Sequence, residues 1–151
     1  MLDRADELRD TEFVYRRISD QNYNIGDPFP AQVAFRPNNK DDTNGLSFRR
    51  AKYVPLHKAA ISPRQPSKHF YVARLRLGDL RREGMQLEID AKDRKHVFIV
   101  NLNYSNRRER QQSEWQVKMA QELCTVHDPS KIRGWAKALD TILCWFRQQF
   151  C

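Results

Sequence analysis

Cysteine and long apolar runs are scarce in this chain of 151 residues. Its three cysteines, Cys124, Cys144 and Cys151, lie late in the chain without a Cys-x-x-Cys spacing, which argues against a disulfide framework or a zinc site. No apolar run approaches the roughly 18 residues that span a bilayer, and residues 1–10 lack the apolar stretch of a secretory signal. We therefore expect a cytoplasmic protein with reduced cysteines and no membrane contact.

The common catalytic motifs are also missing from the sequence. It contains no Walker loop, no Gly-x-Gly-x-x-Gly, no His-Glu-x-x-His and no Gly-x-Ser-x-Gly. The four histidines (His57, His69, His96 and His127) are scattered without a metal-ligand spacing. His96 opens an apolar segment, where a nearly buried structural histidine is expected. These observations predict no metal ion and no cofactor, and they favour a non-enzymatic protein.

Arginine is what the chain has in excess. Lysine and arginine together number 27 against 19 acidic residues, which gives a formal charge of +8. Many arginines occur as doublets: Arg16-Arg17, Arg49-Arg50, Arg81-Arg82 and Arg107-Arg108. A guanidinium group binds phosphate or carboxylate through two parallel hydrogen bonds, which an ammonium group cannot do. The composition therefore predicts a polyanionic or acidic partner.

The order of secondary-structure signals, strands first and helices last, predicts an α+β fold. We expect one domain over residues 1–151, built as a mixed or antiparallel sheet of about four to six strands with two C-terminal helices packed on it. Alternation and β-branched content indicate strands near residues 12–18, 46–49, 70–77, 85–91 and 96–104. Capping signals and helical periodicity indicate helices near residues 113–126 and 129–149.

The last predicted helix has one apolar arc and one large residue outside it. The arc comprises Ile132, Trp135, Ala136, Leu139, Ile142, Leu143, Phe146 and Phe150. Cys144 falls on the polar arc, whereas Trp145 lies on neither. We interpret Trp145 as a candidate anchor for a partner subunit, because tryptophan is enriched at interface hot spots. The alternative is that the fold simply covers this side of the helix as well.

Two predicted strands carry opposite charges. If segments 70–77 and 85–91 pair as an antiparallel hairpin, Arg74 and Arg76 share a face with Glu88 and Asp90. Arginines neutralised in this way are not free to bind phosphate.

The strongest candidate for nucleic-acid binding is a basic run on either side of segment 96–104. It comprises Arg94, Lys95, Arg107, Arg108 and Arg110. Arginine side chains, and the neighbouring asparagines and glutamines, donate to phosphates and base edges. The alternative interpretation is a solvated linker, as charged runs usually are.

A second candidate site comes from three short motifs. The segments Tyr15-Arg16-Arg17, Ala34-Phe35-Arg36-Pro37 and Leu46-Ser47 resemble segments of a set of small bacterial proteins to which no activity is attached. The resemblance covers residues 13–100 and implies a bacterial setting without implying a reaction. From these residues we derive an alternative nucleotide site at Arg16, Arg17, Arg36 and Ser47.

Three hypotheses on function follow. The first is a basic accessory protein that binds nucleic acid, or an acidic partner within a nucleic-acid-handling complex. The second is a small nucleotide-directed enzyme that uses the alternative site, with Glu88 polarising a ribose as ADP-ribosyl transfer requires. The third is a purely protein-binding subunit anchored through Trp145.

Overall fold

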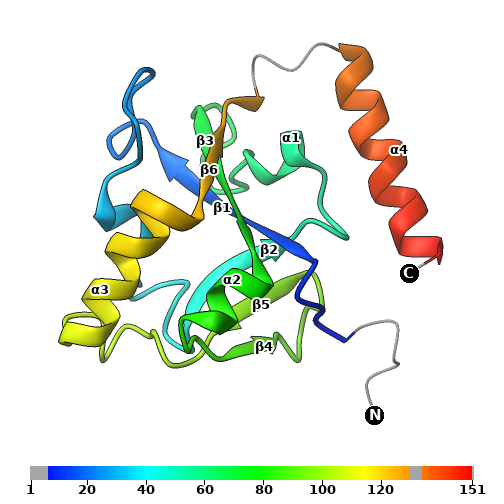
Figure 1. The fold of residues 1–151 in the computed structure, drawn as a ribbon. Helices are drawn as coiled ribbons and strands as arrows, with labels where there is room; N and C mark the ends of the chain where they lie inside the picture. Colours follow the sequence, from blue (N-terminus) through cyan, green and yellow to red (C-terminus); the bar gives the residue numbers. More distant parts are fainter. Residues whose placement is uncertain (1–6, 130–133, 151) are drawn as a thin grey trace.

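Six antiparallel strands form a single sheet at the centre of the structure (Figure 1). The computed structural model describes residues 7–129 and 134–150. The strands are β1 (Phe13–Ser19), β2 (Leu46–Arg50), β3 (Phe70–Arg76), β4 (Leu87–Ile89), β5 (His96–Ile99) and β6 (Thr125–His127). They lie in the order β4-β5-β2-β1-β3-β6. The predicted α+β class is therefore confirmed, and the sheet is wholly antiparallel.

One face of the sheet, here called the inner face, carries the main core. Alternation along β1 places Val14 and Ile18 on this face, and their partners across the sheet include Leu75 on β3. Phe48 on β2 and Val97 on β5 extend the same layer. All five side chains are essentially inaccessible to solvent. The apolar alternation in the sequence is thus what fixes which way each strand faces.

The inner face is covered by short helices. These are the 3-10 turn η2 (Gln32–Phe35), α2 (Leu77–Arg82), α3 (Arg110–Lys118) and the π-helical turn η3 (Met119–Leu123). Trp115 and Met119 bring the α3–η3 segment into the core. The predicted helix 113–126 therefore starts three residues earlier and ends before β6. The β-branched Thr125 and Val126 pair with the free edge of β3, so tertiary pairing overrides the helical periodicity there.

The opposite face, here called the outer face, is only partly covered. The segment 51–60, which includes α1 (Leu56–Ala59), packs over Tyr15 and Val72 as a second small cluster. The last helix, α4 (Gly134–Phe150), lies against residues 51–53. Figure 1 shows α3 and α4 on opposite sides of the molecule, with the strands between them.

The packing of α4 differs from the prediction. Cys144, placed on the polar arc, is 4% exposed and its thiol lies 3.5 Å from the carbonyl oxygen of Lys52. Ile142, Leu143 and Phe146, placed on the buried arc, are each about half exposed. The predicted orientation of this helix took the sheet itself as the surface on which it packs. Segment 51–60 covers that part of the outer face, so α4 packs against residues 51–53 instead. The predicted start of this helix, within residues 130–133, lies outside the described residues.

The predicted pairing of segments 70–77 and 85–91 is wrong. β3 pairs with β1 and β6, whereas β4 pairs with β5 at the other end of the sheet. Leu77 turns directly into α2, and Gly84 ends that helix with a positive φ of 91°. A helix between the two strands leaves no hairpin. Arg74 and Arg76 are therefore not paired across strands with Glu88 and Asp90.

The predicted strand 96–104 is also shorter in the structure. Asn103 and Asn106 each accept a backbone N–H from the other, at 3.1 and 2.8 Å, and so close a turn. Asn101 accepts the backbone N–H of Gln86 at 2.9 Å. Beyond Ile99 these side-chain hydrogen bonds accompany isolated backbone bonds, such as that from the Val100 N–H to the Gln86 carbonyl oxygen at 2.9 Å, in place of a continuous ladder. His96, expected to be nearly buried, has a side chain that is 34% exposed and lies 3.7 Å from the Asp93 carboxylate.

Candidate anion-binding face

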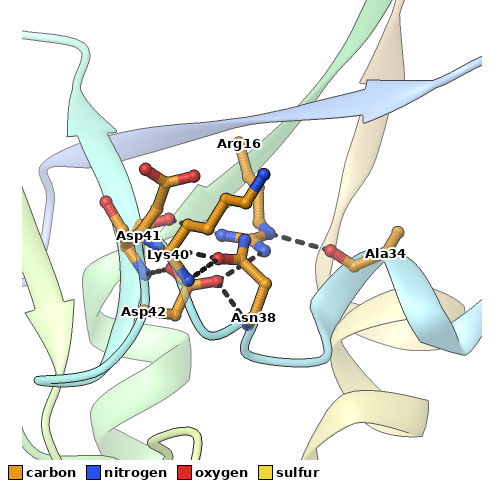
Figure 2. A network of polar contacts seen from close by, with 7 residues as sticks. Arg16, Ala34, Asn38, Lys40, Asp41 and Asp42 are labelled. Atoms are coloured by element: carbon orange, nitrogen blue, oxygen red, sulfur yellow. Dashed lines mark hydrogen bonds and ion pairs between the residues drawn. The ribbon is translucent and has the colours of Figure 1, made fainter.

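Arg16 is the centre of a buried polar network on the inner face (Figure 2). Its Nε donates to the carbonyl oxygen of Ala34 at 2.8 Å, and its Nη1 donates to that of Ser47 at 2.9 Å. Its Nη2 lies 3.2 Å from the carboxylate of Asp42, which is completely buried. Every nitrogen of this guanidinium therefore already has a partner within the fold.

Asp42 completes the network from the other side. One carboxylate oxygen accepts the backbone N–H of Asn38 at 3.0 Å, and the other accepts that of Ser47 at 2.9 Å. A buried carboxylate is tolerated when hydrogen bonds and a cation satisfy it in this way. Figure 2 shows the Arg16 side chain reaching from its strand to the loop that carries Asn38 and Asp42. The network holds the loop 38–45 against the sheet.

The three short motifs of the alternative nucleotide site meet at this network. Arg16 belongs to the first motif and binds the main chain of Ala34 in the second and of Ser47 in the third. What the three motifs have in common is that these hydrogen bonds link segments that are far apart in the chain. We therefore leave Arg16 out of the candidate site.

The rest of the alternative nucleotide site is divided between two places. Arg17, Ser47 and Glu88 face the outer side of the sheet, as shown by the register through β2, β5 and β4. Two strand spacings separate Ser47 from Glu88, which amounts to roughly 10 Å. Arg36 is exposed just after η2. The structure therefore groups Arg17 with Ser47 and separates both from Arg36.

Arg49 is a neighbour of Arg17 that the sequence analysis did not assign to a site. Tyr15 pairs with Arg49, so Arg17, two residues further along β1, shares the outer face with it. Both guanidiniums are half-buried. The alternating pattern of β2 contained this information, because an arginine doublet in a strand must point one member to each face. Arg50, the other member, is fully buried and paired with Glu12 at 2.7 Å.

The basic run assigned to nucleic acid is split by β5. Arg94 and Lys95 precede the strand, and their carbonyl oxygens accept hydrogen bonds from Arg50 at 3.1 and 2.8 Å. Arg107, Arg108 and Arg110 follow the turn at the other end of the strand. A strand of four residues is about 13 Å long. The two halves therefore do not form a single compact pocket.

The three arginines near the start of α3 differ in their surroundings. The guanidinium of Arg107 lies 3.7 Å from the centre of the Tyr104 ring and also donates to the Tyr104 carbonyl oxygen. Arg108 is exposed. Arg110 is 94% exposed and forms an ion pair with Glu114 at 3.0 Å. Exposed pairs of this kind are worth about 0–1 kcal/mol, so Arg110 can exchange partners.

Metal-ligand clusters and the Cys124 thiol were also considered as sites among the residues that the structure describes. Within residues 7–129 and 134–150, no group of three or more histidine, cysteine or acidic side chains is arranged to hold a metal ion. Burial raises the pKa of the Cys124 thiol to about 11, so this thiol stays protonated near neutral pH. Across the same described ranges, no helix is long and apolar enough to cross a membrane.

Comparison of the chain with protein-family models, with curated proteins and with solved structures finds no match. Function is therefore argued from the site alone.

Proposed function

We propose that this chain is a non-enzymatic accessory protein that binds nucleic acid through exposed basic side chains. One observation supports the proposal most strongly. In the described part of the chain, Lys95, Arg107 and Arg108 form no ion pair, whereas the arginines that stabilise the fold, Arg16 and Arg50, are paired with carboxylates. Three of the five predicted positions therefore carry a positive charge that no carboxylate in the described residues balances.

The spacing of these residues suits an extended polyanion. Arg94 and Lys95 lie at one end of β5, and Arg107, Arg108 and Arg110 lie beyond the other. A single small anion cannot reach both groups, but a phosphate backbone can bind several cations in series. Each cation that neutralises a phosphate releases counterions, so such binding weakens steeply with salt.

The test compares two arginine doublets. In the first variant, Arg107→Gln and Arg108→Gln remove two cations that have no ion pair. In the matched control, Arg81→Gln and Arg82→Gln remove two cations already paired with Asp10 and Asp79. Both variants have the same net charge. Fluorescence anisotropy with labelled single-stranded RNA, single-stranded DNA and duplex DNA is measured at several salt concentrations.

We expect the Arg107/Arg108 variant to bind more weakly than the control. The slope of log affinity against log salt should fall by roughly 0.9 for each duplex phosphate that the variant no longer neutralises. Equal affinities and slopes for the two variants would show that only net charge matters. No binding by the natural sequence at low salt would refute the proposed function.

The exposed face of α4 supports a second candidate function. Ile142, Leu143, Trp145 and Phe146 are all 46–54% exposed, and the rings of Trp145 and Phe146 stack edge to face. An exposed apolar patch of this kind marks an interaction surface. We propose an acidic protein as its partner, because residues 141–149 include Arg147 and no acidic residue. A second copy would instead bring two chains of +8 together.

The partner proposal is tested with amphipathic helical peptides of opposite charge. The acidic peptide should bind the protein of natural sequence, and the basic peptide should not. The acidic peptide should also fail to bind the Trp145→Ala variant. Isothermal calorimetry measures the affinities. Sedimentation measures the oligomeric state of both proteins. A dimer of the natural sequence that the Trp145→Ala variant does not form would show that the partner is a second copy and not an acidic protein.

A further inference from the structure

Arg17 and Arg49 converge on the same short segment of chain. The Nη1 of Arg17 donates to the carbonyl oxygen of Ile61 at 2.6 Å, and the Nη1 of Arg49 lies 3.5 Å from that of Lys58. These two carbonyls are three residues apart, at the end of α1. The two guanidiniums therefore occupy neighbouring positions on the outer face, although they come from different strands.

Neither guanidinium has a carboxylate partner among the described residues. Asp41 is the acidic group that acts on Arg17 at longer range, but it is paired with Arg64 at 3.3 Å. Asp93 acts on Arg49 at longer range and lies 3.7 Å from His96. The Arg17 guanidinium lies 5.8 Å from the centre of the Phe70 ring, but neither of these two half-buried cations has a carboxylate within the described ranges that balances its charge directly.

The electrostatics agree with this geometry. Burial lowers the pKa of Arg17, and the positive charge of Arg49 lowers it further. Burial also lowers the pKa of Arg49. Both groups remain cationic at neutral pH, because a guanidinium ordinarily loses its proton only far above it. An anion placed between them would relieve both effects, since it replaces lost hydration and offsets the repulsion.

Hydrogen-bond capacity points to the class of anion. A guanidinium has five N–H donors, and the structure assigns only the Nη1 of each arginine to a backbone carbonyl. The remaining donors of two adjacent forks suit a group with several equivalent acceptor oxygens. Ser47 shares this face and adds a hydroxyl, and Phe98, its partner on β5, adds an aromatic ring.

We propose that Arg17 and Arg49 together bind a phosphate group on the outer face of the sheet. This site deepens the proposed function. Where the bound phosphate belongs to nucleic acid, the inference rests on that function. A free nucleotide would present the same chemistry. In either case Phe98 lies beside the phosphate site, where a base could stack on its ring.

The experiment uses charge-preserving substitutions. Arg17→Lys and Arg49→Lys keep the positive charge but remove the planar fork. Arg74→Lys is the matched control, because Arg74 is a half-buried arginine on the same face that stacks on Phe13 at 4.2 Å. The arginine Nε–H signals of each full-length protein are followed by NMR. Separate titrations use AMP, adenosine and a single-stranded oligonucleotide at constant ionic strength.

We expect AMP to shift the signals of Arg17 and Arg49 in a saturable way, and adenosine to leave them in place. Each lysine variant at these two positions should bind AMP about tenfold more weakly, whereas Arg74→Lys should not. Equal weakening by all three variants, or no shift with any phosphate-containing probe, would overturn the site.

The oligonucleotide separates this site from the proposed function. If the oligonucleotide shifts both signals and its binding weakens in Arg49→Lys, the bound phosphate belongs to nucleic acid. If AMP shifts them but no oligonucleotide binds, the site stands as a nucleotide site and the proposed function fails. Oligonucleotide binding that depends on Arg107 and Arg108, with both signals unmoved by every probe, would refute the site and keep the function.

Discussion

Arg16 and Arg17 are neighbours in one strand and have opposite surroundings. Arg16 faces the inner side, where every nitrogen of its guanidinium has a partner and the buried carboxylate of Asp42 balances its charge. Arg17 faces the outer side, where its nearest charged neighbour in β2 is another cation, Arg49. The role of each arginine therefore depends on its partners. A guanidinium paired with a carboxylate stabilises the fold, whereas one without such a partner is available to a ligand.

The same division runs through the whole sheet. Arg50 repeats the arrangement of Arg16, since it is buried and held by Glu12. Arg49 repeats that of Arg17. Because side chains alternate along a strand, the two doublets that lie in strands, Arg16-Arg17 and Arg49-Arg50, each place one arginine in a structural role and one on the outer face. Counting arginines therefore overstates the number that can bind a partner.

The largest expected effect tests this division directly. Arg16→Met should lower the free energy of unfolding by about 3–5 kcal/mol, because it leaves the buried Asp42 carboxylate without its cation. Arg17→Met should change stability by no more than about 1 kcal/mol, since it removes a half-exposed cation that has no carboxylate partner. Urea denaturation followed by circular dichroism measures both. Similar losses in the two variants would end the distinction between the faces.

A second pair of variants compares the helices on the two sides of the molecule. Trp115 is 7% exposed and its Nε1 donates to the Glu83 carbonyl oxygen at 3.1 Å. Trp115→Ala should cost about 3–5 kcal/mol, as truncation of a core aromatic does. Trp145 is 54% exposed, and Trp145→Ala should cost at most about 1 kcal/mol. Thermal melting of each variant checks the order, and a larger loss at Trp145 would place it in the core.

The smallest expected effect concerns pH and the outer face. Burial lowers the pKa of His127, and the charge of Arg74 lowers it further. The unfolded chain takes up a proton near pH 6.5, where native His127 still resists protonation. The unfolded state therefore binds more protons below this pH, and the free energy of unfolding falls as the solution is acidified.

The control for this prediction is His127→Gln, which removes the titrating group. The natural sequence should lose more stability than the variant between about pH 7 and pH 5, as measured by urea denaturation at each pH. Parallel losses would show that His127 does not resist protonation in the native state.

Much of the fold was predictable because it depends on local patterns. Alternation in segments 13–18 and 71–76 determined which residues enter the inner core, and the strand predicted at residues 46–49 forms as β2. The division of roles within the two arginine doublets that lie in strands was also implicit in that alternation. The length of β5 was not, because three asparagines that bind the main chain take the place of a continuous ladder after Ile99.

Strand order and helix orientation depended on tertiary structure. Nothing local in the sequence places α2 between β3 and β4 and sends those strands to opposite ends of the sheet. Helical periodicity also does not show that segment 51–60 packs on the outer face, between the sheet and α4. The composition determined that the chain is basic. Only the fold decided that Arg16 is neutralised by Asp42 and that Arg17 lies beside Arg49, because ion pairing depends on distances between residues far apart in the chain.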